Sequence, residues 1–439
     1  MKINIDKKIT DVIARDKKVI FETTRENFPF VAESANGDYT YDISGNRFID
    51  FSSYIGVYTL GDNANNEIRT SIKRQVDKLM HAAFLDFYSE LPVTFAEKLV
   101  KHFPNGFGRV FFSNSGTEAN EDAIKLAKIF TGKQFLMSFY NGFHGRSLGS
   151  LALTSSKQSQ KRHMGPFSDY IHVPYPNTYR NLWRTSEPKE VADACLSFIE
   201  TNVLKRDVSS EDIAAIFLES VQGEGGIIVP PKEFVVGIRK MATENNMLLV
   251  DDEIQAGYMR TGKFLALDNF GVTADVYTMA KALGAGIPIG ATIAKSSLGD
   301  VPHGSHAGTF GGNLVAMAAA NASIDYVDAN KNKLESDVKR KSQYIMKRLE
   351  EMKDKYEIVG DVRGLGLMIG AELVKNKKTK EPATDAMNKV IDACFNNGLL
   401  LLPAGVSTIR IMPPIPISVK NLEKGMDILE EAIKISNVR

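Results

Sequence analysis

Two apolar stretches that end in charged residues decide the fold: residues 246–255 read NMLLVDDEIQ, and residues 276–290 read VYTMAKALGAGIPIG. Apolar runs of this length followed by polar residues are typical of parallel strands that are covered on both faces. In open α/β sheets the ligand site lies at the carboxyl ends of the strands. We therefore expect Asp252 and Lys281 to meet at one such edge.

Lys281 is the only charged side chain between Asp275 and Lys295. Desolvation in apolar, glycine-rich surroundings lowers the pKa of a lysine, and the neutral amine that results is a nucleophile toward aldehydes. Together with Asp252 it would meet both needs of a pyridoxal ring, an amine for its aldehyde and a carboxylate for its ring nitrogen. The other interpretation is a lysine whose ammonium group reaches out to water.

The composition is that of a soluble globular protein. At 439 residues, 43% hydrophobic and 24% charged, the chain can form two domains. A net charge of +1 gives no case for nucleic acid or an anionic membrane as a partner. Cys195 and Cys394 have no CxxC spacing, and we see neither a secretory signal nor a membrane span, so we expect a cytoplasmic protein with buried thiols.

Strand and helix patterns alternate from about Arg69 to Val327, which predicts a mostly parallel α/β sheet wrapped by helices. We expect this large domain to span residues 61–327 and a small α+β domain to form from residues 1–60 and 328–439. The elements expected in the small domain are a helical segment over the first 35 residues, hairpin strands over 39–51, a helix over 331–355, strands near 357–373 and 408–411, and a helix over 422–435.

Residues 109–120, RVFFSNSGTEAN, run from a strand into a helix. Ser115 and Glu118 fit an ordinary capping box. The same helix start, with Gly116 allowing close approach, also suits a phosphate group. The motifs GxxxxGKS and GxxxxGKT are absent, which excludes a nucleotide P-loop.

Further candidate residues lie in glycine-rich or apolar surroundings. Phe143 could stack on a heterocycle and Arg146 could bind a carboxylate, or both could belong to a plain surface turn. Glu224 follows another apolar strand. Arg410 stands alone in a long uncharged stretch, so if buried it needs either a structural ion pair or a substrate carboxylate.

Two other patterns are set aside. Seven histidines without an HExxH motif predict no zinc site, and His303 with His306 is more typical of a loop. Residues 364–370, GLGLMIG, have the wrong glycine spacing for a dinucleotide motif and continue as a strand.

Taken in order, the motifs SNSGTEAN, FHGR, ESVQGEGG, DDEIQ, RTGKF, AKALGAGIP, GTFGGN and RIMPP resemble those of the class III pyridoxal-phosphate aminotransferases of fold type I. The resemblance covers nearly the whole chain, from Phe51 to Arg410. It implies that Lys281 forms the Schiff base with pyridoxal 5′-phosphate and shuttles the substrate proton, while Asp252 pairs with the ring nitrogen. The other cofactor contacts that it implies are Gln255 near the ring hydroxyl, Ile254 and Phe143 on the two ring faces with His144 beside them, Ser115, Gly116 and Thr117 at the phosphate, and Thr309 from a second subunit of a homodimer or larger assembly.

The resemblance also implies a substrate. In members that act on 4-aminobutyrate, the residue matching Arg146 holds the carboxylate distal to the reacting amine. Arg410 would hold the α-carboxylate of glutamate, and Glu224 would cover Arg410 when an ω-amine is bound. Ile55 matches an apolar residue of the same members. We therefore expect transfer of the ω-amino group of 4-aminobutyrate to 2-oxoglutarate.

The sequence departs from the common family pattern at Gly61-Asp62, Ser220 and Met259. None of these positions carries the core chemistry, but they leave the amino donor open. An ornithine or lysine ω-aminotransferase and an amino-acid racemase that uses the same lysine are the alternatives.

Overall fold

The computed structural model describes residues 3–23, 28–61 and 66–437, so that Asp62 lies outside the described residues. The chain divides into two compact units, one made of residues 1–66 with 337–439 and the other of residues 67–336. Helix α10 (Leu314–Lys355) contributes residues to both units.

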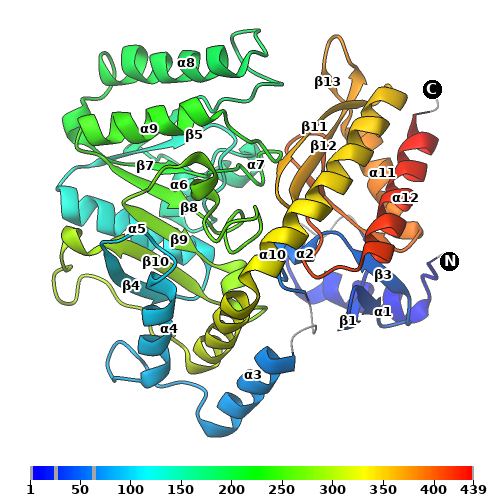
Figure 1. Ribbon diagram of the computed structural model, residues 1–439, viewed down its shortest axis with the longest axis horizontal. Coiled ribbons are helices and arrows are strands. Elements are labelled where there is room, and N and C mark those ends of the chain that lie inside the picture. Colours follow the sequence, from blue (N-terminus) through cyan, green and yellow to red (C-terminus); the bar gives the residue numbers. More distant parts are fainter. Residues whose placement is uncertain (1–2, 24–27, 62–65, 438–439) are drawn as a thin grey trace. The chain divides into compact units, whose positions relative to one another are not determined.

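A seven-stranded sheet forms the centre of the 67–336 unit, in the order β4-β10-β9-β8-β7-β5-β6 (Figure 1). Strand β10 is antiparallel to both neighbours, whereas the strands from β9 to β6 pair in parallel. All six residues of β7 are buried, as expected for a strand covered on both faces. The strands are β4 (Phe107–Ser113), β5 (Phe135–Phe139), β6 (Tyr170–Val173), β7 (Ile213–Leu218), β8 (Leu248–Asp252), β9 (Val276–Met279) and β10 (Gly290–Lys295).

Helices flank this sheet, and α5 packs on its central strands (Figure 1). Ala123, Ile124 and Ala127 of α5 share one buried core with Phe217 of β7 and Val250 of β8. Small side chains on the helix allow this close approach to the larger ones on the strands. The helices and short helical turns of the unit are α3 (Asn66–Lys78), α4 (Glu90–Val100), α5 (Gly116–Thr131), α6 (Leu148–Leu153), α7 (Gln158–Lys161), α8 (Pro188–Phe198), η1 (Ile199–Leu204), η2 (Ser210–Asp212), α9 (Lys232–Glu244), η3 (Ala266–Phe270), η4 (Lys281–Gly284) and η5 (Ser296–Leu298).

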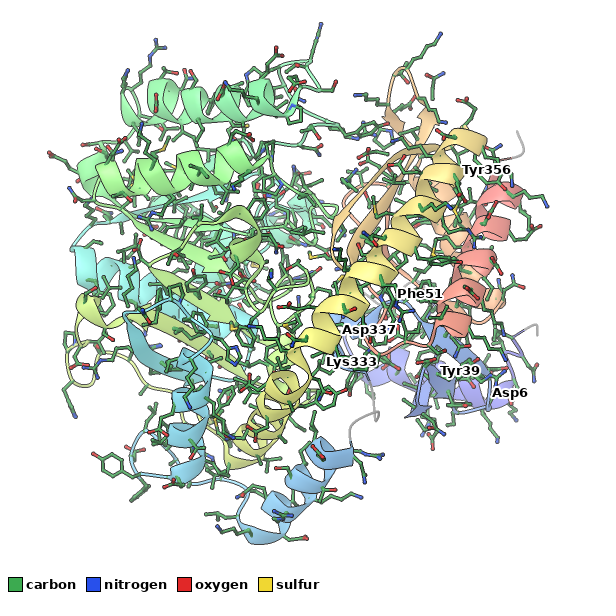
Figure 2. The ribbon with its side chains drawn as sticks, in the orientation of Figure 1. Asp6, Tyr39, Phe51, Lys333, Asp337 and Tyr356 are labelled. Carbon is green, nitrogen blue, oxygen red and sulfur yellow. The ribbon has the colours of Figure 1, made fainter. Side chains whose placement is uncertain are left out.

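Both ends of the chain build the other unit, as the side chains of Figure 2 show around Tyr39 and Phe51. The Tyr39 hydroxyl donates to Asn421 Oδ1 at 2.6 Å. A Cβ atom on Gly425 would lie 2.3 Å from the Phe51 ring, so glycine is needed where the last helix meets the first strands. The elements of this unit are α1 (Lys7–Val19), β1 (Ala32–Asn36), β2 (Tyr39–Asp42), β3 (Arg47–Asp50), α2 (Ser53–Gly56), β11 (Val359–Leu365), β12 (Met368–Asn376), β13 (Glu381–Pro382), α11 (Thr384–Asn396), β14 (Leu399–Leu400), β15 (Leu402–Ala404), β16 (Thr408–Ile411) and α12 (Val419–Ser436).

These elements form two small sheets, with orders β1-β2-β3-β14 and β11-β12-β16-β15, and β13 adds to β12. The expected strand over 408–411 and the closing helix are confirmed. Residues 364–370 lie in β11, β12 and the turn between them, in agreement with the strand expected there. Both cysteine thiols are buried, as expected. Within the described residues, no helix combines the length and apolar character needed to cross a bilayer.

Two expectations for the chain ends are wrong in extent. The first 35 residues are not helical throughout, because Ala32–Asn36 pairs with Tyr39–Asp42 as an edge strand. The helix expected from Lys331 begins instead at Leu314. Its first part is rich in buried alanine and other apolar residues, so it lacks the charged face that marks the later part in the sequence.

Candidate functional site

The carboxyl ends of β7, β8 and β9, together called the carboxyl edge here, bring the first two predicted residues together. Asp252 pairs in register with Thr278, and the Glu253 N–H donates to the Thr278 carbonyl at 2.9 Å. Lys281 follows three residues after Thr278, so it lies at the same edge as the Asp252 carboxylate. The prediction that these strand ends coincide is confirmed.

Lys281 has an unusual backbone conformation. Its φ is 47°, in the left-handed region that non-glycine residues rarely occupy. Such a conformation costs on the order of 1–3 kcal/mol, and residues that keep it cluster at functional sites. The residue is half-buried.

Asp252 is buried, with 4% of its surface exposed, and is held by two side chains from other elements. Its Oδ2 atom accepts hydrogen bonds from Asn120 Nδ2 and His144 Nδ1, both at 2.8 Å. Its Oδ1 atom accepts a longer hydrogen bond, of 3.1 Å, from the Ile254 N–H, and within the described residues it accepts no other. Burial alone would lower the pKa of His144, but the hydrogen bond and charge of Asp252 outweigh it and raise that pKa. When His144 is protonated, its imidazolium and the Asp252 carboxylate therefore form a buried ion pair.

Asn120 is a site residue that sequence reasoning quoted within a motif but gave no role. Besides Asp252, its Nδ2 atom donates to the His144 carbonyl at 2.6 Å, and its Oδ1 atom accepts from the Thr278 hydroxyl at 2.9 Å. It therefore joins α5, β8, β9 and the loop of His144. The available signal was an asparagine inside a helix, where its propensity is poor.

The start of α5 forms the second part of the site. The Glu118 N–H donates to Ser115 Oγ at 3.3 Å, which confirms the helix cap, while Glu118 Oε2 accepts from the Asn114 N–H at 2.6 Å. A Cβ atom on Gly116 would lie 2.9 Å from the Ile254 side chain, so only glycine allows Ile254 this close to the helix start. The unsatisfied N–H groups and positive dipole end of the first turn suit an anion. Capping and anion binding are thus compatible at this helix start.

Thr117, also predicted at the phosphate, is bonded to neighbouring hydroxyls. Its Oγ1 atom lies 2.7 Å from Ser147 Oγ and 2.5 Å from Ser150 Oγ, and it accepts the Arg146 N–H at 3.1 Å. The helix start is therefore tied to the loop that carries Phe143, His144 and Arg146.

That loop presents Arg146 on the surface. Its guanidinium carbon lies 5.8 Å from the Phe143 ring centroid, a cation–π geometry. Within the described ranges of the chain, no ion pair or side-chain hydrogen bond of this guanidinium is found, and the side chain is exposed. Phe143 is fixed by its N–H, which donates to Glu219 Oε1 at 2.8 Å.

Glu219 follows β7, and the sequence motif that contains it did not indicate its role. Its second oxygen accepts the Gly223 N–H at 3.0 Å, so one carboxyl group fixes two loops. Burial raises the pKa of Glu219 to about 7. Glu224 lies in the second of these loops, and its Oε1 atom forms an ion pair with Lys157 Nζ at 3.0 Å. Gln255 lies beneath the same loop, since a Cβ on Gly223 would be 2.5 Å from its side chain.

The contacts described above do not include three of the predicted residues. Ile55 and Arg410 belong to the unit formed by the chain ends, and their roles stay predictions. Ile55 has a φ of 65°, a rare conformation for a β-branched residue, and Arg410 is buried with 4% exposed. Thr309 lies exposed in the loop before α10. In the part of the chain that the structure describes, no group of three metal-ligating side chains gathers.

Comparison with known proteins decides the family. The model of the aminotransferase class-III family matches residues 20–433. The chain belongs to the class III aminotransferases. It is 35% identical over 429 residues to a leucine/methionine racemase of Thermococcus litoralis, covering 96% of this chain and 95% of the relative. It is 33% identical to a probable 4-aminobutyrate aminotransferase of Bacillus subtilis, covering 92% and 93% of the two chains.

The solved structures agree with this family. The taurine:2-oxoglutarate aminotransferase of Bifidobacterium kashiwanohense, solved with pyridoxal phosphate and glutamate, superposes with a TM-score of 0.90 at 27% identity, over 98% of each chain. A Bacillus anthracis aminotransferase has a TM-score of 0.88 at 28% identity, over 98% of this chain and 99% of the other. The fold of this class III aminotransferase is therefore that of the pyridoxal-phosphate-dependent transaminases, and pyridoxal 5′-phosphate is its cofactor.

The residues of the carboxyl edge fit that cofactor. The aminotransferase presents an amine on the half-buried Lys281, a buried carboxylate at Asp252 whose Oδ1 accepts only a 3.1 Å hydrogen bond among the described residues, and a glycine-containing helix start at Gly116. These are the three kinds of group that an aldehyde, a ring nitrogen and a phosphate require.

Proposed function

We propose that this aminotransferase transfers the ω-amino group of 4-aminobutyrate, or of a related ω-amino acid, to 2-oxoglutarate. The observation that carries the proposal is Arg146. Its exposed guanidinium has no ion pair within the described residues, and it lies two residues from His144, which holds Asp252. A short ω-amino acid has its carboxylate and its amine at opposite ends. With the carboxylate bound at Arg146, the amine would reach toward Lys281.

Within this proposal each residue has a definite task. Lys281 binds the cofactor aldehyde and moves the proton at the substrate carbon, while Asp252, held in place by His144 and Asn120, faces the ring nitrogen. The bound cofactor supplies an electron sink that acidifies the substrate C–H bond. Ser115, Gly116 and Thr117 hold the phosphate, Ile254 and Phe143 enclose the ring, and Gln255 lies near the ring hydroxyl.

The test compares two amines that differ only in a carboxylate. Arg146→Gln should raise KM for 4-aminobutyrate by about 10- to 100-fold, the loss expected for a hydrogen-bonded charge pair. The KM for n-butylamine should hardly change, and Arg146→Lys should restore part of the difference. An equal loss with both amines would contradict the assignment of Arg146.

A second function, racemisation of an apolar amino acid, is favoured by one observation. Two relatives at 35% identity are a leucine/methionine racemase and an alanine/serine racemase, and they match 96% and 97% of this chain. Both reactions begin with removal of a proton by a lysine, but a racemase needs no keto acid.

One assay separates the alternatives. Holoenzyme is incubated with 4-aminobutyrate, L-ornithine, L-lysine or L-leucine, each with and without 2-oxoglutarate. If 4-aminobutyrate is the only donor from which glutamate forms, the result supports the proposal. If glutamate forms from ornithine or lysine instead, the enzyme is an ornithine or lysine ω-aminotransferase. D-leucine formed without acceptor would establish racemisation instead.

We also propose a homodimer whose face includes an exposed apolar patch. The exposed apolar residues that we assign to it are Leu79, Met80, Phe87, Tyr88 and Phe310. The His81 and Phe310 rings lie 4.9 Å apart, so the segment after α3 and the loop of Thr309 are adjacent. Association through this patch would bring Thr309 to the second subunit. Sedimentation of Phe87→Glu should show a monomer, whereas a wild-type monomer would refute the assembly.

A further inference from the structure

We propose that Glu121, a residue of α5, positions Arg146 for the amino donor by fixing the start of α6. The inference rests on the proposed function, because that function assigns the carboxylate of the donor to Arg146. No motif of the chain implies a role for Glu121. Its carboxylate holds the residues that follow Arg146 in the chain, so Glu121 is a positioning residue and not a group that binds the donor.

One carboxylate oxygen of Glu121 holds the start of α6. Its Oε1 atom accepts the Ser150 N–H at 2.8 Å and the Ser147 hydroxyl at 2.6 Å. Ser150 lies in the first turn of α6, where backbone N–H groups have no acceptor within their own helix. Ser147 is the N-cap residue, but its side chain forms no capping hydrogen bond. The carboxylate of α5 therefore supplies the cap from outside α6.

The close approach of Glu121 to α6 depends on Gly149. A Cβ atom at position 149 would lie 2.2 Å from Glu121 Oε2, so a larger residue there must displace the carboxylate. The hydrogen bonds of Glu121 can therefore be broken in two ways, by removing the carboxylate or by adding one methyl group at position 149.

A second residue of α5, Thr117, fixes the backbone of Arg146 directly. Thr117 Oγ1 accepts the N–H groups of Arg146 at 3.1 Å and of Ser147 at 3.2 Å. Because two donors occupy the lone pairs of this hydroxyl oxygen, its own proton goes to Ser147 Oγ at 2.7 Å or to Ser150 Oγ at 2.5 Å. These two serines are the residues that Glu121 holds. Through them, Glu121 fixes the hydroxyl group that orients the peptide of Arg146.

The test compares 4-aminobutyrate with n-butylamine in steady-state assays of the holoenzyme. Glu121→Ala should raise KM for 4-aminobutyrate by about 3- to 10-fold, the range that a lost hydrogen bond supports, and should hardly change KM for n-butylamine. Glu121→Gln should keep the wild-type ratio of the two KM values, because an amide oxygen can accept the same two hydrogen bonds. Gly149→Ala should change the ratio as Glu121→Ala does, and the double variant should change it no further.

A second measurement does not depend on the donor. In the holoenzyme, the Ser150 amide should exchange its hydrogen for deuterium about 3- to 10-fold faster in Glu121→Ala than in wild type, because it loses its acceptor. The rate in Glu121→Gln should equal that of wild type.

Three results would each overturn the inference: unchanged exchange at Ser150 in Glu121→Ala, an unchanged KM ratio in that variant, or a changed ratio in Glu121→Gln. Arg146→Gln in the same assay separates these results from failure of the proposed function. If Arg146→Gln changes the ratio and Glu121→Ala does not, the inference alone fails. If Arg146→Gln leaves the ratio unchanged, the proposed function fails and the inference fails with it.

Discussion

Replacing His144 with leucine would leave the Asp252 carboxylate buried without its charged partner. Removing one member of a buried ion pair costs about 3–5 kcal/mol. Asn120 and the Ile254 N–H still donate to the carboxylate, so we expect the lower end, about 3 kcal/mol. Urea unfolding followed by the fluorescence of Trp183, the single tryptophan, reports on the unit that contains the site.

The pH dependence gives this prediction a sign. The pKa of His144 is raised in the folded protein above its ordinary 6.5. Its stabilising contribution is therefore complete below pH 6.5 and is lost as the pH rises through the raised pKa. The loss in the free energy of unfolding that His144→Leu causes should therefore be largest in acid and should become smaller above neutrality.

His172 provides a matched control. Desolvation, with the nearby charge of Lys161, lowers its pKa to about 4, so this half-buried histidine is neutral near pH 7. Its contribution is present above pH 6.5 and is lost as the pH falls toward 4, so the deficit of His172→Leu should shrink in acid. A loss below about 1 kcal/mol for His144→Leu at pH 6, or a deficit that grows with pH, would refute the ion pair.

Three further changes test the packing and protonation of the site. Gly145→Ala should destabilise by about 2–4 kcal/mol in thermal unfolding, because φ is 140° and the new Cβ would lie 2.2 Å from Thr117 Oγ1; Gly132→Ala, at φ 68° with open space, should cost only about 1 kcal/mol. Burial raises the pKa of Glu219 from 4.5 to about 7, so the free energy of unfolding should fall by about 3 kcal/mol as the pH rises from 4.5 to 7. Urea unfolding at several pH values should show that Glu219→Gln abolishes this pH dependence. Asp251→Asn should cost less stability above neutrality than in acid, since burial raises the pKa of Asp251 and the wild type alone therefore loses stability as the pH rises; a loss that is larger above neutrality, measured by urea unfolding, would contradict the raised pKa.

That Asp252 and Lys281 lie at one sheet edge could be predicted from the sequence, because the signal is local. Asp252 and Lys281 each end an apolar run, and strands of such runs terminate at a common sheet edge. The capping of α5 by Ser115 could also be predicted, since a serine and a glutamate three residues apart mark a helix start. Family motifs then added roles that no local pattern could supply.

The supporting hydrogen bonds could not be predicted, because their partners lie far apart in the chain. Asn120 and Asp252 are separated by 132 positions. Strand β1 was missed for a different reason. Its AESAN sequence is mostly exposed and shows no alternation, and it is a strand only because Tyr39–Asp42 pairs with it.

Strand β10 has a consequence for how Lys281 and the start of α5 move relative to each other. The segment that begins at Lys281 returns as β10, whose first residue, Gly290, pairs with Ser113. A Cβ on Gly290 would lie only 2.4 Å from the Ser115 carbonyl. One short piece of backbone therefore connects Lys281 rigidly to the start of α5. A shift of Lys281 or of the start of α5 should therefore be transmitted to the other. We expect a bulkier residue at position 290 to weaken phosphate binding at the proposed site, although none of the side chains proposed to contact the phosphate is changed.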